Sequence, residues 1–251
     1  MPHNRSVFEG LMLLPVFVPV VFWAIYHYHK DRHLPEPPLL LLVTFLLGIG
    51  ASWLSRGMYL SLDAVGLRFD AVALANESVL GLLAYAVLVI GPVEELSKLL
   101  PFLLIVLRFR EFDEPLDGMI YASFIALGYA AAENVYYLQF LTPVEALGRG
   151  FAGPVLHILF ASIWGHWIGM AHVEGRSITN CAIKGFATAA VLHGIYDFIV
   201  LLEPIGALPV AGLMIVSIWV WRLKLMHVMH LDAVAANESA QPSTTDDSES
   251  R

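Results

Sequence analysis

Five acidic or basic side chains stand inside stretches of sequence that are otherwise apolar, and they are the residues best placed to do chemistry. They are Glu94, Glu95, Lys98, Glu133 and Asp197. An ionised side chain near the centre of a bilayer costs roughly 2.5–3.5 kcal/mol, so five of them facing lipid would cost on the order of 15 kcal/mol. We therefore expect these side chains to face one another or a hydrated cavity inside a helix bundle.

The first cluster contains two adjacent acids and a lysine. Pro92, just before it, removes a helix hydrogen bond and can kink the helix. Glu94 and Lys98 are four positions apart, so they can pair on one helix face, whereas Glu95 points about 100° away from Glu94. We expect Lys98 to pair with Glu94, which would leave Glu95 as the freer general base. A buried ion pair that only fixes helix packing is the alternative for Glu94 and Lys98.

The second cluster lies at the two ends of one apolar stretch. Glu133, followed by Asn134, has no basic residue in the same stretch. Asp117 stands at the opposite end, where a carboxylate is an ordinary helix cap, and we prefer that interpretation. The small residues between them, such as Ala126 and Gly128, allow neighbouring helices to approach closely.

Two histidines complete the set. His193 and Asp197 are four positions apart, so the carboxylate can orient the imidazole or share a metal ion with it. His157 lies in a different apolar stretch. One histidine on an apolar helix usually serves packing, but two on separate helices, together with the acids, indicate a functional site. His166 lies between Gly165 and Gly169, a spacing that indicates a helix contact instead.

The composition excludes a disordered chain and an ordinary soluble enzyme. Apolar residues make up 58% of the 251 residues and charged residues 14%, about half the charged share of soluble domains. The single cysteine, Cys181, forms no internal disulfide, and no basic stripe indicates a nucleic-acid partner. We predict an all-α fold, a polytopic transmembrane helical bundle with about seven spans. The expected spans are residues 7–28, 38–60, 79–107, 116–140, 151–173, 181–202 and 205–226.

The loops and the chain ends suggest an orientation. Short loops on one side hold eight Lys and Arg residues and those on the other side hold four, which places the N-terminus outside and the C-terminus in the cytoplasm. The acids and imidazoles would then share a mid-to-outer layer of four spans. We expect residues 1–231 to form the membrane domain, residues 61–78 an interfacial or extramembrane helix, and residues 232–251 a disordered cytoplasmic tail.

Four motifs in chain order resemble those of the PrsW family of intramembrane proteases, which is distantly similar to CAAX prenyl endopeptidases and Abi-type immunity proteins. The segment at residues 30–37 is similar to the family's charged Pro-Glu-Pro loop. The matching motif residues are Glu94, Glu95 and Lys98; Asp117 and Gly118 followed by Glu133, Asn134 and Tyr137; His157; and His193 with Asp197. Each motif alone is weak, but four in order inside apolar stretches are specific.

The resemblance implies hydrolysis of peptide bonds of membrane-anchored proteins, as in the outer-side cut of an anti-sigma factor, in a bacterial inner membrane. Two mechanisms stay open. In one, Glu94 or Glu95, helped by His157, is the general base, and His193 with Asn134 donates to the oxyanion. In the other, zinc bound by His157, His193 and either Glu133 or Asp197 lowers the pKa of water to about 7, with Glu94 or Glu95 as the base. Lys98 and Asp117 would be supporting residues.

Asp197 bears on this choice, because it stands where relatives carry either Asn or Asp. An ionised Asp cannot donate a hydrogen bond, so we expect Asp197 to orient His193 or to bind metal.

Two other classes of function compete with a protease. Intramembrane acids and histidines also form the proton relays of transporters. Against this, the sequence shows no inverted repeat and no second broken helix to match Gly91-Pro92. The other class is a non-catalytic membrane scaffold or immunity-type protein on a protease fold, since a fold does not fix a function.

Overall fold

The protein was analysed as a computed structural model that describes residues 3–30, 35–202, 206 and 208–240. These residues form helices and no strand, which confirms the predicted all-α class. The long helices are α1 (His3–Lys30), α2 (Pro38–Ala64), α5 (Gly91–Leu104), α6 (Pro115–Tyr137), α7 (Pro143–Val173), α8 (Ile178–Leu202) and α9 (Leu208–Ala240). The short elements are α3 (Ala71–Glu77), α4 (Val79–Tyr85), the π-helix η1 (Ala86–Ile90) and the 3-10 helix η2 (Val106–Arg108).

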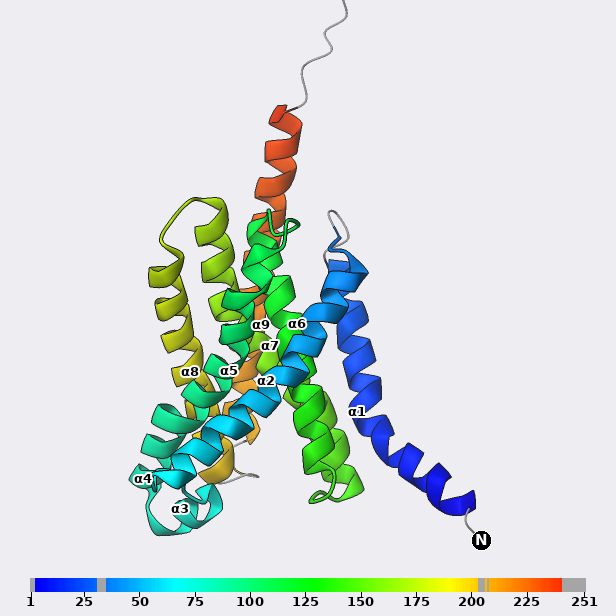
Figure 1. Ribbon diagram of the computed structural model, residues 1–251, viewed down its shortest axis with the longest axis vertical. Coiled ribbons are helices and arrows are strands. Elements are labelled where there is room, and N and C mark those ends of the chain that lie inside the picture. Colours follow the sequence, from blue (N-terminus) through cyan, green and yellow to red (C-terminus); the bar gives the residue numbers. More distant parts are fainter. Residues whose placement is uncertain (1–2, 31–34, 203–205, 207, 241–251) are drawn as a thin grey trace, which may run out of the picture.

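The helices form an elongated bundle around α6 (Figure 1). Five of the described segments are long and apolar enough to cross a membrane: Pro38–Ala64, Val79–Arg108, Val144–Val173, Ile178–Leu202 and Pro209–Met229. A shorter apolar segment covers Val16–His29 in α1. The remaining expected span, residues 116–140, corresponds to α6, which is enclosed by other helices. The prediction of about seven spans therefore agrees with the long helices, with α6 as the member that other helices shield.

Helix α6 is buried along most of its length. Every residue from Leu116 to Ala130 is buried, and α2 and α7 make its largest contacts. Glycine permits the crossing with α2, because a Cβ added at Gly128 would lie 1.9 Å from the backbone oxygen of Phe45. The predicted helix contact of Gly165 and Gly169 is also present, since a Cβ at Gly169 would lie 2.3 Å from the oxygen of Pro115 in α6.

The expected span at residues 79–107 is one continuous apolar segment in which the type of helix changes locally. Helix α4 continues into the π-helix η1, and α5 follows directly with Pro92 in its first turn. Proline has no N–H to donate to the carbonyl four residues earlier, and its ring clashes with that carbonyl. A widened π turn accommodates this, so the kink expected at Pro92 takes the form of a π-helix.

Several boundaries differ from those expected. Helix α2 runs to Ala64, so only the second part of the expected 61–78 segment forms a separate short helix, α3, whose N-terminus is capped by Asp70. Helix α9 continues to Ala240, past the expected start of a disordered tail at residue 232, and residues 241–251 lie outside the described part. The division into a membrane domain and a tail therefore stays a prediction.

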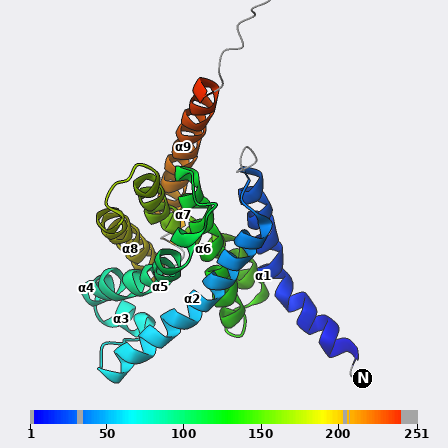
Figure 2. The ribbon, with the colours of Figure 1, turned by 45° about the horizontal axis from the view of Figure 1, so that its top comes forward.

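Two helices project from the bundle. Figures 1 and 2 both show the N-terminal half of α1 leaning away from the other helices and the C-terminal end of α9 extending beyond them.

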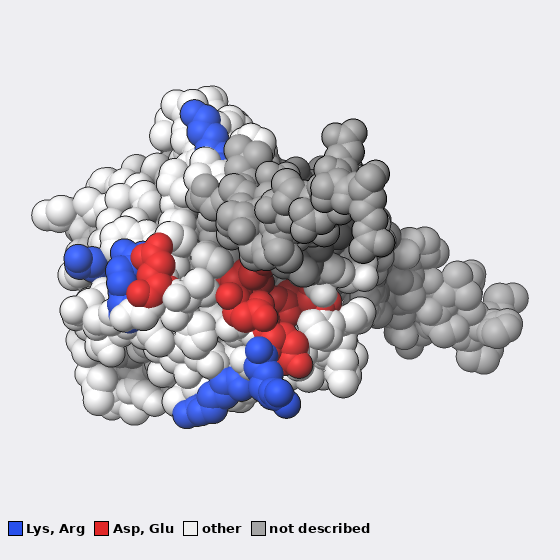
Figure 3. Space-filling model, turned by 90° about the horizontal axis from the view of Figure 1, so that it is seen from above, with Lys and Arg blue, Asp and Glu red and all other residues white. Residues whose placement is uncertain are grey.

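Figure 3 looks onto the end of the molecule that is uppermost in Figure 1. Acidic side chains gather near its middle, with Lys and Arg toward the rim. The loop between α5 and α6 carries exposed charges of both signs, among them Arg110, Glu111 and Asp113.

Candidate active site

Glu95 is the fully buried carboxylate that joins three helices. Its Oε1 accepts a hydrogen bond from Lys98 Nζ at 2.5 Å and lies 2.8 Å from His193 Nδ1 of α8. Its Oε2 accepts from Trp164 Nε1 of α7 at 2.9 Å. The expectation that Lys98 pairs with Glu94 is therefore wrong. Positions three and four apart are both helix neighbours, and Glu95 is the acid that faces the bundle interior with Lys98.

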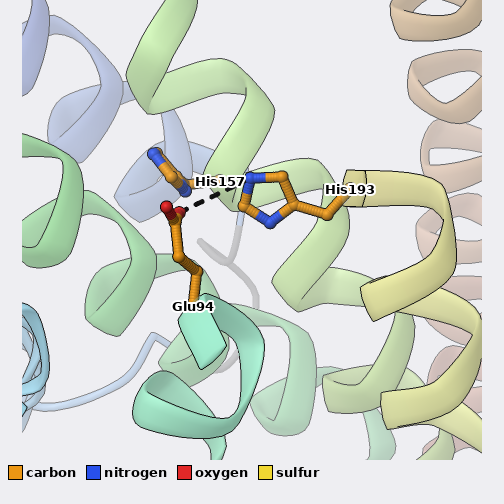
Figure 4. A group of neighbouring side chains, drawn as sticks. All are labelled: Glu94, His157 and His193. Carbon is orange, nitrogen blue, oxygen red and sulfur yellow. Dashed lines mark ion pairs between the residues drawn. The ribbon is translucent and has the colours of Figure 1, made fainter. Parts of the chain in front are cut away.

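Glu94 is consequently the freer of the two acids, which reverses the expectation for Glu95. Among the described residues no Lys or Arg forms an ion pair with Glu94. Its Oε2 lies 3.6 Å from His193 Nε2. Figure 4 shows Glu94 from α5, His157 from α7 and His193 from α8 pointing toward one another. One ligand atom from each of these three residues lies within 4.8 Å of the others.

The imidazole of His193 is held in a defined orientation. A carboxylate can only accept a hydrogen bond, so Nδ1 carries the proton that it donates to Glu95. Phe160 stacks on the ring with centroids 4.8 Å apart. Nε2 therefore faces the site, where the carboxylates of Glu94 and Asp197 both approach it to 3.6 Å. Glu95 orients the ring through one nitrogen, and Asp197 contacts the other.

His157 uses both of its ring nitrogens. Nε2 lies 2.9 Å from Glu133 Oε2, and Nδ1 lies 3.2 Å from Lys98 Nζ. A lysine ammonium group can only donate, so Nδ1 accepts from Lys98 and Nε2–H donates to Glu133. Lys98 thereby connects Glu95 to His157.

Arg149 lies at the edge of this cluster, beside Glu133. Its guanidinium lies 3.1 Å from Glu133 Oε2 and rests 3.8 Å from the ring centre of Tyr137. Arg149 falls in the loop between the expected spans 116–140 and 151–173, and no role was expected for Trp164. Helix spacing could have found both, because Arg149 stands eight residues before His157 and Trp164 seven residues after it, on the same face of α7.

Asn134 brings an unsatisfied amide close to the cluster. It is buried, and neither its Oδ1 nor its Nδ2 has a hydrogen-bond partner among the described residues. A Cβ added at Gly153 would lie 3.4 Å from that Oδ1. Gly153 is one turn of α7 before His157, so the amide lies beside the turn of α7 that precedes the imidazole.

Asp117 is not part of this cluster. Its Oδ2 accepts hydrogen bonds from the backbone N–H groups of Asp113 and Glu114, at 2.9 and 2.7 Å. This is the helix-capping arrangement that we preferred for it. Nearby, Glu36 of the Pro-Glu-Pro segment is buried and accepts a hydrogen bond from the hydroxyl of Tyr121. Asp117 therefore belongs to the junction of loops at the other end of α6.

A glycine-lined crossing brings α5 and α8 together at the site. A Cβ at Gly91 would lie 2.1 Å from the backbone oxygen of Ala190, and one at Gly194 would lie 2.4 Å from that of Ala86. These backbones touch because both positions lack a side chain. Glu94 and Glu95 follow Gly91 within one helical turn, and His193 precedes Gly194, so this contact sets the distance between acid and imidazole.

Acids and imidazoles from four helices thus surround one buried point in a helical membrane protein, and they include a carboxylate, Glu94, that has no Lys or Arg ion-pair partner in the described part of the chain. Hydrolysis needs such an arrangement, because a positioned base must activate water and donors must stabilise the oxyanion. The fold and site together define an intramembrane hydrolytic enzyme.

Comparison with known proteins identifies the family. Residues 36–222 match the family model described as "PrsW family intramembrane metalloprotease". Proteins named Protease PrsW are similar to the chain. That of Clostridioides difficile is 28% identical over 83% of this chain and 87% of its own length. That of Geobacillus kaustophilus is 30% identical over 70% and 73%. That of Bacillus subtilis is 28% identical over 69% and 75%.

No solved structure matches the chain. The chain belongs to the PrsW family of intramembrane proteases. The transporter and scaffold alternatives are not favoured by these findings.

Proposed function

We propose that this intramembrane protease uses Glu94 to activate the water that attacks the peptide bond. The observation that carries the proposal is the division of labour between the two adjacent acids. Glu95 is occupied by Lys98, Trp164 and His193, whereas Glu94 lies beside His193 with no Lys or Arg paired to it among the described residues. A carboxylate free of a permanent cation is the better proton acceptor.

The proposed reaction follows from these positions. A water molecule between Glu94 and His193 gives a proton to Glu94 as its oxygen attacks the peptide carbonyl carbon. The amide of Asn134 donates from Nδ2 to the resulting oxyanion. The C–N bond then breaks, and the proton held by Glu94 passes to the leaving nitrogen, which yields one carboxyl and one amino product. Glu95 acts as a positioning residue, because it holds His193 through Nδ1.

A divalent metal ion, zinc in the first instance, is the second candidate for water activation. Glu94, His157 and His193 would hold it, and this O, N, N donor set is typical of catalytic zinc sites. A bound zinc ion lowers the pKa of water to about 7. A histidine that binds zinc through one ring nitrogen usually donates a hydrogen bond from the other nitrogen to a carboxylate, and His193 Nδ1 makes such a bond to Glu95. Against it, both nitrogens of His157 already have partners, so His157 would have to give one up.

Charge adds a reason to test for a metal. The carboxylates of Glu133 and Asp197 act electrostatically on Glu94. Glu133 is paired with Arg149, but Asp197 has no Lys or Arg ion-pair partner among the described residues. Three acids around two imidazoles therefore leave negative charge that either a proton or a metal ion would offset.

The test is cleavage by the purified chain in lipid vesicles. The probe is a panel of single-span membrane proteins that includes anti-sigma factors. Glu94→Gln should abolish cleavage, and Glu77→Gln on the exposed helix α3 should leave it unchanged. Full activity of folded Glu94→Gln would refute the role of Glu94. Metal analysis and chelation of the same wild-type sample choose between the two ways of activating water. Activity in a metal-free preparation would eliminate zinc.

The substrate, membrane and orientation extend the same proposal. We infer a membrane-anchored regulatory protein of a bacterial inner membrane, cut on the outer side, with the N-terminus of this chain outside and its C-terminus in the cytoplasm. The relatives are bacterial proteases, which supports a bacterial membrane and a protein substrate, and the Lys and Arg distribution supports the orientation. Substituted-cysteine labelling from each side tests it, and labelling of both ends from one side would contradict the inferred orientation.

A further inference from the structure

Arg222 of α9 is a buried cation in a second polar cluster, apart from the active site. It is 3% exposed. Its Nε donates to Ser162 Oγ of α7 at 2.8 Å, and an Nη donates to Ser123 Oγ of α6 at 2.9 Å. Ser123 stands ten residues before Glu133, about 15 Å along the axis of α6. Arg222 therefore takes no part in the catalytic cluster.

The two serines solvate Arg222 without neutralising it. Ser162 and Ser123 each donate their own proton to a backbone oxygen four residues earlier, at 2.7 and 2.6 Å. They therefore present only neutral lone pairs to the guanidinium. Among the described residues no ion pair joins Arg222 to a carboxylate. A buried charge is strongly unfavourable unless a counter-charge accompanies it.

Two further groups near Arg222 lack hydrogen-bond partners. Trp23 Nε1 and His27 Nε2 of α1 are both buried and unpartnered within the described part of the chain. His27 Nδ1 donates to the backbone oxygen of Trp23 at 2.7 Å, so in the neutral ring Nε2 is a vacant acceptor. The indole N–H is a vacant donor. Trp219, three residues before Arg222 on α9, packs against Trp23 with ring centroids 5.2 Å apart, which places these groups in one neighbourhood.

This neighbourhood lies toward the ends of α1 and of the apolar segment of α9. Trp23 and Tyr26 of α1 pack against Trp219 of α9, with ring centroids 5.2 and 5.9 Å apart. His27 is close to the end of α1 at Lys30, and Arg222 lies seven residues, about 10 Å, before the end of the apolar segment at Met229.

We propose that Arg222, Trp23 and His27 bind the headgroup of an anionic phospholipid between α1 and α9. The phosphate would accept from the guanidinium and from the indole N–H, and it would supply the missing negative charge. A headgroup hydroxyl would donate to His27 Nε2, which favours a glycerol headgroup. The rings of Trp23, Tyr26 and Trp219 form the contact between the two helices, so parting them opens a path from the bilayer to Arg222.

The test uses the full chain in nanodiscs or detergent, with dioleoyl phosphatidylglycerol as the probe, dioleoyl phosphatidylcholine as the zwitterionic control and inorganic phosphate as the free anion. Phosphatidylglycerol should raise the melting temperature and remain bound in native mass spectrometry. Arg222→Gln should weaken retention tenfold or more, because a charged hydrogen bond is lost. Arg222→Lys should restore part of it, and Trp23→Phe, which keeps the aromatic packing, should give an intermediate loss. Arg176→Gln, at an exposed ion pair, is the matched control.

The outcomes separate the sources of phosphate. An equal effect of inorganic phosphate would overturn the lipid assignment in favour of a free-anion site. Should the wild-type chain show no preference for phosphatidylglycerol over phosphatidylcholine, the proposal fails without reference to any variant. Equal retention by folded Arg222→Gln and by wild type would likewise overturn it.

Discussion

Adding a single methyl group at the α5–α8 crossing should disable the enzyme while leaving it folded. In Gly91→Ala the new Cβ would lie 2.1 Å from the backbone oxygen of Ala190, whereas carbon–oxygen contacts are normally about 3.3–3.6 Å long. This oxygen belongs to the backbone, so it cannot rotate away. Helix α8 would therefore have to move by about 1 Å or more relative to α5.

That displacement acts directly on the catalytic geometry. The 2.8 Å contact between His193 Nδ1 and Glu95 would lengthen beyond hydrogen-bonding distance, and Glu94 would lose its position beside Nε2. A 1 Å misplacement can cost about 100-fold in rate. The cost in stability is smaller, because overpacking of about 1–3 kcal/mol is offset by about 1 kcal/mol from replacing glycine with alanine in a helix. Activity should therefore fall much more than stability.

The assay measures kcat/KM on a cleaved member of the substrate panel, together with the melting temperature of the same sample. Gly194→Ala should behave like Gly91→Ala, since its Cβ would lie 2.4 Å from the oxygen of Ala86. Gly50→Ala and Gly212→Ala are matched controls, because no heavy atom lies within 4 Å of either added Cβ. If folded Gly91→Ala keeps activity near that of the controls, the crossing does not set the geometry of the site.

Two further variants test the network around Glu95, and a third tests the helix cap at Asp117. Lys98→Met leaves Glu95 buried without its cation and should destabilise the protein by about 3–5 kcal/mol; a loss in denaturant unfolding below about 1 kcal/mol would contradict the assigned ion pair. Trp164→Phe keeps an aromatic ring but removes one donor, so a loss of about 1.5–3 kcal/mol is expected, and an unchanged melting temperature would show that the bond contributes little. Asp117→Ala removes the helix cap and should cost about 0.5–2 kcal/mol while the activity per folded molecule is kept; a selective loss of activity would instead place Asp117 in the catalytic machinery.

The sequence alone predicted the helical membrane fold and the identity of most residues in the cluster. Both predictions rest on the cost of ionised groups in lipid, which forces Glu94, Glu95, Glu133, His157 and His193 to face inward whatever the exact helix boundaries. Approximate boundaries of the spans are enough for this argument. Convergence of these residues was therefore predictable without a tertiary structure.

Their pairing was not predictable in the same way. Lys98 can reach an acid either three or four positions away along its helix, and only the neighbouring helices decide between them. Trp164 and His193 both direct hydrogen bonds at Glu95, so that acid is the one that faces inward. The role of Arg149 was missed for a related reason, because a charge eight residues before His157 was assigned to a loop when α7 in fact begins at Pro143.

The enclosure of α6 has a consequence for how the protein is made. This helix is not one of the five described segments apolar enough to cross a membrane by composition, and its Asp117 and Glu133 have partners in the loop before it and on α7. During synthesis, we expect α6 to remain beside the insertion machinery until α7 emerges and to enter the bilayer with it as a hairpin. Glycosylation mapping of nascent chains that end before or after α7 would test this order, and stable insertion of chains that lack α7 would contradict it.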